Sequence, residues 1–147
     1  ESVRWDTYIP IVERITRGAG VPYFPSLGNH DVTFDAATDP TRLLGRRNSL
    51  AAYAKLIPPE GSPRRLSGAV RYALGYGNTF FIALDSNVGA DPMQLGWTTD
   101  QLERLDRSRY RNVVVFFHHP PFTSGRYSTG ASAPCTGCRS AYATSSS

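Results

Sequence analysis

The three histidines of this chain are the side chains best suited to chemistry, because each follows a short apolar run. His30 comes soon after residues 21–25, and His118 and His119 come directly after residues 113–117. In α/β sheets, ligand sites form beyond the carboxyl ends of the strands. The pattern therefore predicts a site with imidazoles at strand ends. The alternative is that these histidines only cap the strand ends through hydrogen bonds.

The residues around His30 form a tetrapeptide, Gly28-Asn29-His30-Asp31, that makes chemical sense as a unit. Gly28 lets the backbone turn tightly and approach a ligand. The amide oxygen of Asn29 is a hard, neutral donor for a divalent cation. His30 can donate a proton to a leaving oxygen, and Asp31 can hold that imidazole in one tautomer.

A second motif begins with the apolar residues 113–117, which predict a buried strand with His118 at its tip. Pro120 and Pro121 then turn the chain away. A strand-end imidazole is a good metal ligand. Successive strand residues face opposite sides of a sheet, so His119 is expected to point elsewhere.

The elements that must position these motifs follow from the periodicity of apolar residues, and they indicate an α/β fold. Helical spacing predicts three helices, over residues 5–15, 50–57 and 98–105, the first with Pro10 in its first turn and the last capped by Thr98 or Thr99. Alternating or continuous apolar runs predict four strands, over residues 21–25, 70–76, 80–84 and 113–117. The middle two are expected to form an antiparallel hairpin, and residues 32–48 a loop.

The amino-acid composition indicates which broad classes of protein are favoured. Forty per cent of the 147 residues are hydrophobic, which is enough for a packed core. The formal charge is +4, and every basic residue except Lys55 is an arginine. Because the arginines are scattered, nucleic-acid binding is not favoured. No apolar run approaches the roughly 20 residues of a membrane span.

Two further groups of polar residues are expected to be structural. Asp85 and Asn87 follow a predicted strand, and we interpret them as shaping a turn rather than binding metal. Residues 127–147 predict a loop or a frayed end. Cys135 and Cys138 within it could be redox-active or half of a zinc site, but a loop disulfide or idle thiols are favoured. A disulfide would indicate an exported protein.

Taken together, the motifs resemble the calcineurin-like metallophosphoesterase superfamily, and its purple-acid-phosphatase-like branch is the nearest match. Residues 28–31 resemble the family's G-N-H-[DE] block, residues 115–118 its V-x-x-H block, and residues 80–87 the strand between them. Residues 1–126 are therefore interpreted as the central part of such a domain. The resemblance implies part of a β-sandwich of mixed sheets flanked by helices.

The resemblance also implies a phosphoester substrate and two metal ions, which could be iron, manganese or zinc. Asn29 and His118 would bind the same ion. His30, assisted by Asp31, would stabilise or protonate the leaving group. The reaction would be hydrolysis of a phosphate monoester or diester, with a metal-bound hydroxide attacking phosphorus.

Three other motifs of the family are absent from these residues: D-x-H or D-x-G, G-D-x-x-[DY], and G-H-x-H. We expect them to lie outside this chain, and we therefore expect the chain alone to be inactive. An incomplete sheet should also leave an exposed edge and apolar surface. The alternative is a degenerate, non-catalytic domain that uses its loops to bind a partner or an anion.

Overall fold

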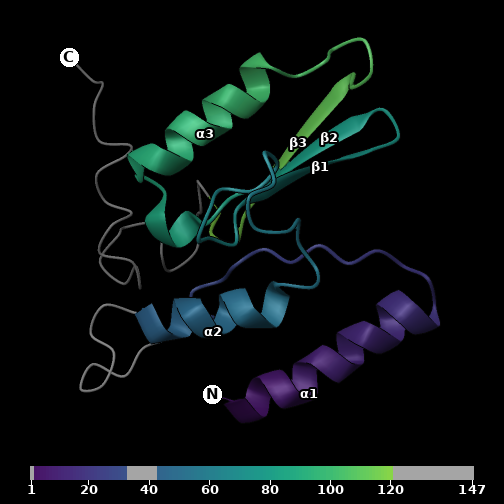
Figure 1. Ribbon diagram of the computed structural model, residues 1–147, viewed down its shortest axis with the longest axis vertical. Helices are drawn as coiled ribbons and strands as arrows, with labels where there is room; N and C mark the ends of the chain where they lie inside the picture. The colour runs from purple at the N-terminus through teal and green to yellow at the C-terminus, as the bar shows by residue number, and fades with distance from the viewer. Residues whose placement is uncertain (1, 33–42, 121–147) are drawn as a thin grey trace.

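The computed structural model describes residues 2–32 and 43–120, which form helices packed on a mixed sheet (Figure 1). The elements are α1 (Ser2–Glu13), a π-helical turn (Arg14–Gly18), α2 (Leu43–Tyr53), β1 (Tyr72–Tyr76), β2 (Thr79–Ala83), a 3-10 turn (Ser86–Val88), α3 (Pro92–Glu103) and β3 (Asn112–Phe116). The predicted α/β class is confirmed. The β-sandwich stays a prediction, because the described residues form one three-stranded sheet.

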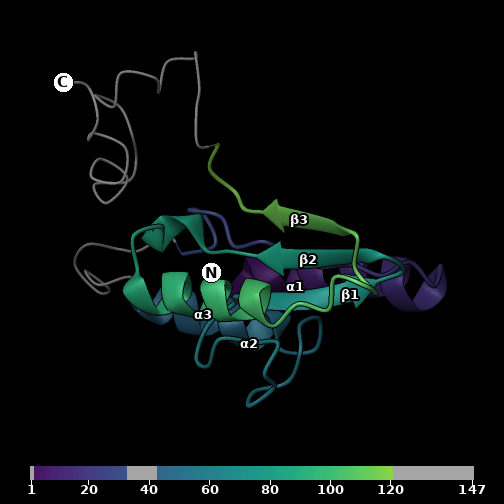
Figure 2. The same ribbon diagram turned by 90° about the horizontal axis from the view of Figure 1, so that it is seen from above.

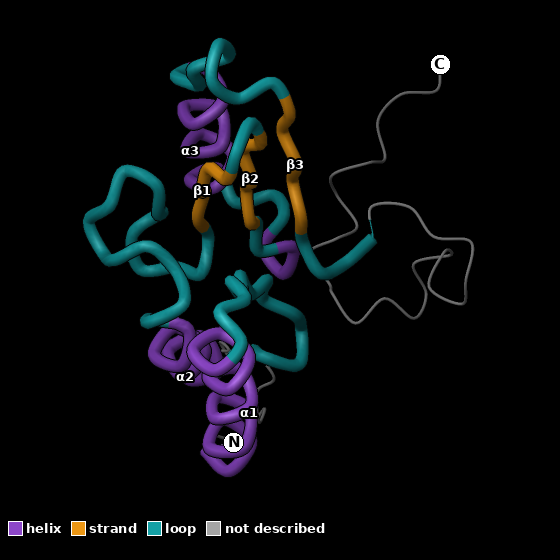
Figure 3. Tube along the Cα trace, turned by 90° about the vertical axis from the view of Figure 1, so that its right-hand side faces the viewer, coloured by secondary structure: helices purple, strands orange, loops and turns teal. Residues whose placement is uncertain are grey.

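The sheet has the strand order β1-β2-β3, which Figure 3 shows as three adjacent orange segments. β1 and β2 form the predicted antiparallel hairpin, with Tyr76 opposite Thr79 next to the turn. Gly77 in that turn has a φ of 56°, a left-handed conformation that glycine adopts without steric cost. The residues of this turn therefore help to fix which residues of β1 and β2 lie opposite one another.

β2 and β3 are parallel, and α3 makes the crossover between them. α3 is capped by Asp91, whose side chain accepts a hydrogen bond from the backbone N–H of Met93. The predicted cap at Thr98 or Thr99 is wrong, because Pro92 and Asp91 start the helix earlier. Since the strands are parallel, the residues after β2 and after β3 emerge at the same edge of the sheet.

The helices lie on both sides of the sheet, α3 on one and the neighbouring α1 and α2 on the other (Figures 1 and 2). Phe80 and Ile82 of β2 point into the core under α3, together with Leu105 and Tyr110. The alternate residue Ala83 belongs to the second core, whose largest buried members include Tyr53, Ile57, Val70 and Tyr72. Because successive side chains of a strand face opposite sides of the sheet, each strand contributes side chains to both cores.

Two predictions about the first helix region are wrong. α1 begins at Ser2, so Pro10 lies inside the helix and not in its first turn. Residues 21–25 form an irregular segment and no strand. Pro22 and Pro25 have no N–H to donate to a neighbouring strand. The carbonyl of Pro25 instead accepts a hydrogen bond from the buried hydroxyl of Tyr72.

The prediction of a loop over residues 32–48 and a helix over residues 50–57 is also wrong in its boundaries. α2 already begins at Leu43 and ends at Tyr53. Its buried face carries polar residues, among them Ser49, which is 0% exposed. A helix that buries polar groups lacks the apolar periodicity by which helices are found in a sequence.

β3 was predicted to be buried, but it lies at the edge of the described sheet and most of its residues are exposed. Val114 and Val115 face opposite sides of the sheet and are 42% and 41% exposed. The predicted exposed edge and apolar surface are therefore present on this strand. Separately, no helix in residues 2–32 or 43–120 is long and apolar enough to cross a membrane.

We expect the Asp91→Ala substitution to lower the free energy of unfolding by about 3 kcal/mol at neutral pH, because it removes a helix cap and leaves Arg71 without its carboxylate. Arg71 Nη1 lies 2.5 Å from Asp91 Oδ2, and Arg71 is buried. Burial alone would raise the pKa of Asp91, but the hydrogen bonds from Arg71 and from the Met93 N–H outweigh it and hold this pKa below its ordinary value.

The sign of this pKa shift gives a pH dependence. A carboxylate with a lowered pKa in the folded state stabilises the protein above its unfolded-state pKa, and this stabilisation is lost as the pH falls through the folded-state pKa. The difference between wild type and Asp91→Ala should therefore shrink below about pH 4. Urea unfolding at pH 7 and at pH 3 measures it, and an equal difference at both pH values would contradict this account of Asp91.

Candidate functional site

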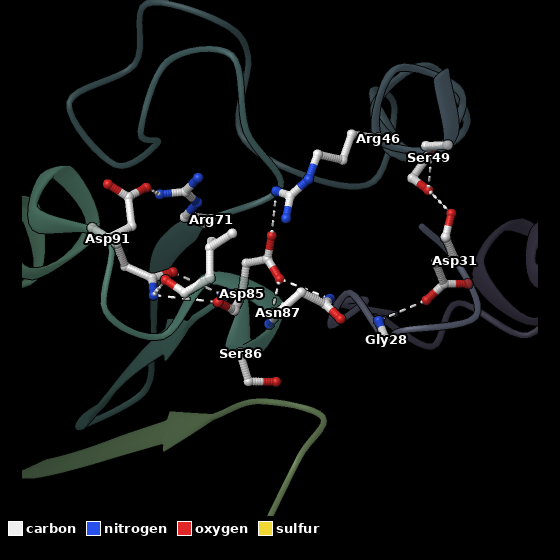
Figure 4. Close-up of polar contacts among 12 residues, drawn as sticks. Gly28, Asp31, Arg46, Ser49, Arg71, Asp85, Ser86, Asn87 and Asp91 are labelled. Carbon is white, nitrogen blue, oxygen red and sulfur yellow. Dashed lines mark hydrogen bonds and ion pairs between the residues drawn. The ribbon is translucent and has the colours of Figure 1, made fainter. Parts of the chain in front are cut away.

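The loop that carries the first motif is held by its own residues and by α2. Residues 29–32 form a turn after the irregular segment. The Asp31 carboxylate accepts a hydrogen bond from the N–H of Gly28, with Oδ2 2.8 Å from the nitrogen. The carbonyl of Asp31 accepts a second bond, at 2.6 Å, from the hydroxyl of Ser49 (Figure 4). The loop is therefore closed on itself and fastened to α2.

The structure brings together the two residues that the sequence suggested as metal ligands. Asn29 Oδ1 and His118 Nε2 lie 2.9 Å apart, although they are 89 residues apart in the chain. A Cβ atom built on Gly28 would lie 3.1 to 3.2 Å from the His118 ring. The absence of a side chain at Gly28 therefore lets this imidazole approach the loop.

His119 contacts Ser86 after the end of β2, whereas His118 contacts Asn29. His119 Nδ1 lies 2.8 Å from Ser86 Oγ, and the backbone N–H of His119 donates to the same oxygen at 3.1 Å. The two imidazole rings meet edge to face, with their centroids 4.8 Å apart. Burial lowers the pKa of His119, and the neighbouring His118 lowers it further, while Asp85 acts in the opposite direction.

Ser86 was not identified from the sequence, although it follows a predicted strand directly. Its hydroxyl oxygen accepts the backbone N–H of His119 and also lies within hydrogen-bond distance of Nδ1 of that ring. These two contacts join the residues after β2 to the residues after β3. Ser86 thus helps to fix the backbone next to His118.

Asp85 shapes the end of β2, which confirms the structural role predicted for it. It is 1% exposed. Its Oδ1 accepts hydrogen bonds from the backbone N–H and the side-chain amide of Asn87, at 2.9 and 2.8 Å. Its Oδ2 lies 2.8 Å from Nη1 of Arg46, which comes from α2 (Figure 4). The partner Arg46 was not predicted, because α2 was expected to start after it.

The Asn29–His118 pair fits one edge of a metal coordination sphere. Two neighbouring ligands of an octahedral ion, with bonds of about 2.1 Å, are about 3.0 Å apart. The two atoms here are 2.9 Å apart, which is the length of a hydrogen bond and also close to that separation. Within residues 2–32 and 43–120, no group of three or more histidine, cysteine, aspartate or glutamate side chains is placed to hold a metal ion.

The remaining residues singled out from the sequence are His30, Asp31, Cys135 and Cys138. His30 is exposed at the tip of the loop, next to Asn29. The Asp31 carboxylate contacts the Gly28 N–H, as described above, and its action on His30 stays a prediction. The predicted loop at residues 127–147, with Cys135 and Cys138, lies outside the residues that the structure describes.

Comparison with known proteins adds no family assignment. No protein-family model matches this chain, and no solved structure is similar enough to count as a match. The case for its function therefore rests on the two motifs and on the geometry that brings them together.

Proposed function

We propose that this chain forms part of the active site of a metal-dependent phosphoester hydrolase. The observation that carries the proposal is the contact between Asn29 and His118, whose donor atoms are 2.9 Å apart at the place where a loop meets a strand end. Each residue belongs to a motif chosen from sequence alone. The fold therefore brings together two residues that were chosen independently, although 89 positions of the chain separate them.

The proposed roles follow from the positions of the side chains. Asn29 and His118 would hold one ion, and further ligands would come from outside the described residues. When bound, the ions would neutralise charge on the phosphate group and supply an activated water. His30 is exposed beside Asn29, where its imidazole can donate a proton to a leaving oxygen. Asp31 holds the loop that carries both residues.

Titration with Mn²⁺ tests the proposal directly. Mn²⁺ is paramagnetic and broadens the NMR signals of nuclei near it, so weak binding is visible residue by residue. We expect broadening first at Asn29 and His118, and at higher Mn²⁺ concentration at the exposed carboxylates. An Asn29→Ala variant should lose the broadening at His118. Broadening that starts elsewhere, and is the same in Asn29→Ala, would instead favour the alternative of a non-catalytic binding domain.

We expect the 147-residue chain by itself to hydrolyse neither a phosphate monoester nor a diester at a measurable rate. Two neutral donors do not hold a divalent ion tightly, because structural and catalytic sites use three or four ligands, usually including charged ones. The measurement is release of nitrophenolate from mono- and bis-nitrophenyl phosphate with Mn²⁺, Zn²⁺ or Fe²⁺ present. Measurable turnover by the 147-residue chain would contradict this expectation. If that turnover disappeared in Asn29→Ala, the activity would depend on Asn29.

A further inference from the structure

One face of α2 carries two polar side chains that contact opposite halves of the candidate site. Arg46 and Ser49 are three residues apart, so they lie on the same face of the helix. Ser49 is fully buried, and the Arg46 side chain is 27% exposed. We call this pair the α2 polar face. Figure 4 shows Arg46 directed at Asp85 and Ser49 directed at Asp31.

Ser49 anchors the loop that carries Asn29. Its hydroxyl donates to the carbonyl of Asp31 at 2.6 Å and lies 2.9 Å from the carbonyl of Gly45 in its own helix. The Asp31 carboxylate in turn accepts the N–H of Gly28. A buried hydroxyl thus fixes one end of the turn, and the carboxylate closes the turn around Asn29.

Arg46 anchors the end of β2, on the other half of the site. Its guanidinium lies 2.8 Å from the buried carboxylate of Asp85. The backbone N–H of Asp85 donates to Gln94 Oε1 of α3 at 2.9 Å. The next residue, Ser86, makes two hydrogen bonds with His119, so the position of Asp85 is transmitted to the backbone that carries His118.

We propose that Arg46 and Ser49 are positioning residues that set the separation between Asn29 and His118. The proposal rests on the proposed function, in which those two side chains bind one ion. Both halves of the site are fastened to the same rigid helix by buried or half-buried bonds. The Asn29–His118 contact itself is exposed to solvent, where a single hydrogen bond cannot hold two chain segments together.

NMR of the full 147-residue chain without metal tests the proposal, with the imidazole ¹⁵N shifts of His118 as the reporter. The Asn29→Ala variant defines the shifts of His118 when the contact is lost. We expect Ser49→Ala and Arg46→Ala to move the His118 shifts toward the Asn29→Ala values. Arg46→Lys should restore most of the wild-type shifts, because a single nitrogen of Arg46 contacts Asp85. Arg47→Ala is the matched control, since Arg47 is on the same helix but exposed.

The same variants are then titrated with Mn²⁺. Residues that orient metal ligands typically change metal affinity by about 10- to 100-fold, and we expect a loss in this range for Ser49→Ala but none for Arg47→Ala. If Arg46→Ala does not fold, Ser49→Ala decides the question, because it deletes one oxygen atom. A folded Ser49→Ala chain with wild-type His118 shifts would overturn the proposal. A folded Arg46→Ala chain whose His118 shifts equal those of Arg47→Ala would overturn it as well.

The two readouts separate the further inference from the proposed function. If Mn²⁺ does not broaden Asn29 and His118 in the wild-type chain, the proposed metal site is wrong. The metal-free His118 shifts still show whether the α2 polar face sets the contact. If Mn²⁺ binds there and Ser49→Ala changes neither the shifts nor the affinity, the metal site stands and the positioning role is wrong.

Discussion

Replacing His118 with alanine should reduce Mn²⁺ binding at Asn29 by at least about 100-fold. A loss of this size exceeds the roughly 10- to 100-fold typical of residues that only orient metal ligands. The imidazole would be one of the two donors that the proposed function assigns to the described residues. Because His118 is exposed, its removal should change the free energy of unfolding by no more than about 0.5 kcal/mol. Mn²⁺ broadening of the Asn29 amide measures the effect.

The matched control for His118→Ala is His30→Ala. His30 is also exposed and lies next to Asn29, but it is assigned to proton donation and not to metal binding. His30→Ala should therefore keep the Mn²⁺ affinity of the wild-type chain. Equal losses of affinity in both variants would show that the ion is bound by a general cluster of imidazoles, and the assignment of roles would then be wrong.

The second large effect is expected on stability: Asp85→Ala should lower the free energy of unfolding by about 3 to 5 kcal/mol. The substitution removes the carboxylate that pairs with Arg46 and leaves the Asn87 N–H without its acceptor. The half-buried guanidinium of Arg46 and the half-buried N–H of Asn87 would keep their desolvation cost after they lose this partner. Denaturant unfolding measures the change.

Asp100→Ala is the control for this prediction. Asp100 also pairs with an arginine, since its Oδ1 lies 2.7 Å from Arg104 Nε, but the Arg104 side chain is 80% exposed. Solvent screens such a pair, so its loss should cost less than about 1 kcal/mol. A similar loss of stability in both variants would contradict the idea that burial makes the Asp85 pair important.

The elements that were predicted correctly from the sequence are those specified by residues close to one another in the chain. The hairpin of β1 and β2 was predicted because its side chains alternate and its turn contains glycine and asparagine. The positions of His118 and His119 after β3 were also predicted. Each of these features depends on residues within about ten positions of one another, so the chain encodes it directly.

The errors arose where tertiary contacts override local preference. Thr98 was a plausible helix cap, but Asp91 caps α3 about two turns earlier, and the hydroxyl of Thr98 donates to the carbonyl of Gln94 instead. α2 was missed at its start because its face toward the site is polar. A polar face can be buried only when partners such as Asp31 and Asp85 are supplied by distant segments.

The exposure of β3 could not be predicted for a similar reason. Its residues are as apolar as those of a buried strand, but burial depends on what lies beside a strand. The strand order places β3 at the edge of the sheet, where Val114 and Val115 are accessible to solvent. β1 is also an edge strand in the described sheet, yet Tyr72 is 0% exposed. Composition specifies that a segment can be buried, and the elements packed against its two faces decide whether it is.

For the candidate site, the sequence by itself determined which residues could do chemistry, because residue type and the flanking strand and turn signals are local properties. Tertiary structure alone decided that Asn29 and His118 meet, since 89 residues of chain separate them. It also decided that Arg46 and Ser49 of α2 hold the two halves of the site. Contacts of this kind depend on the packing of helices against a sheet, in which each separation is set by many side chains at once.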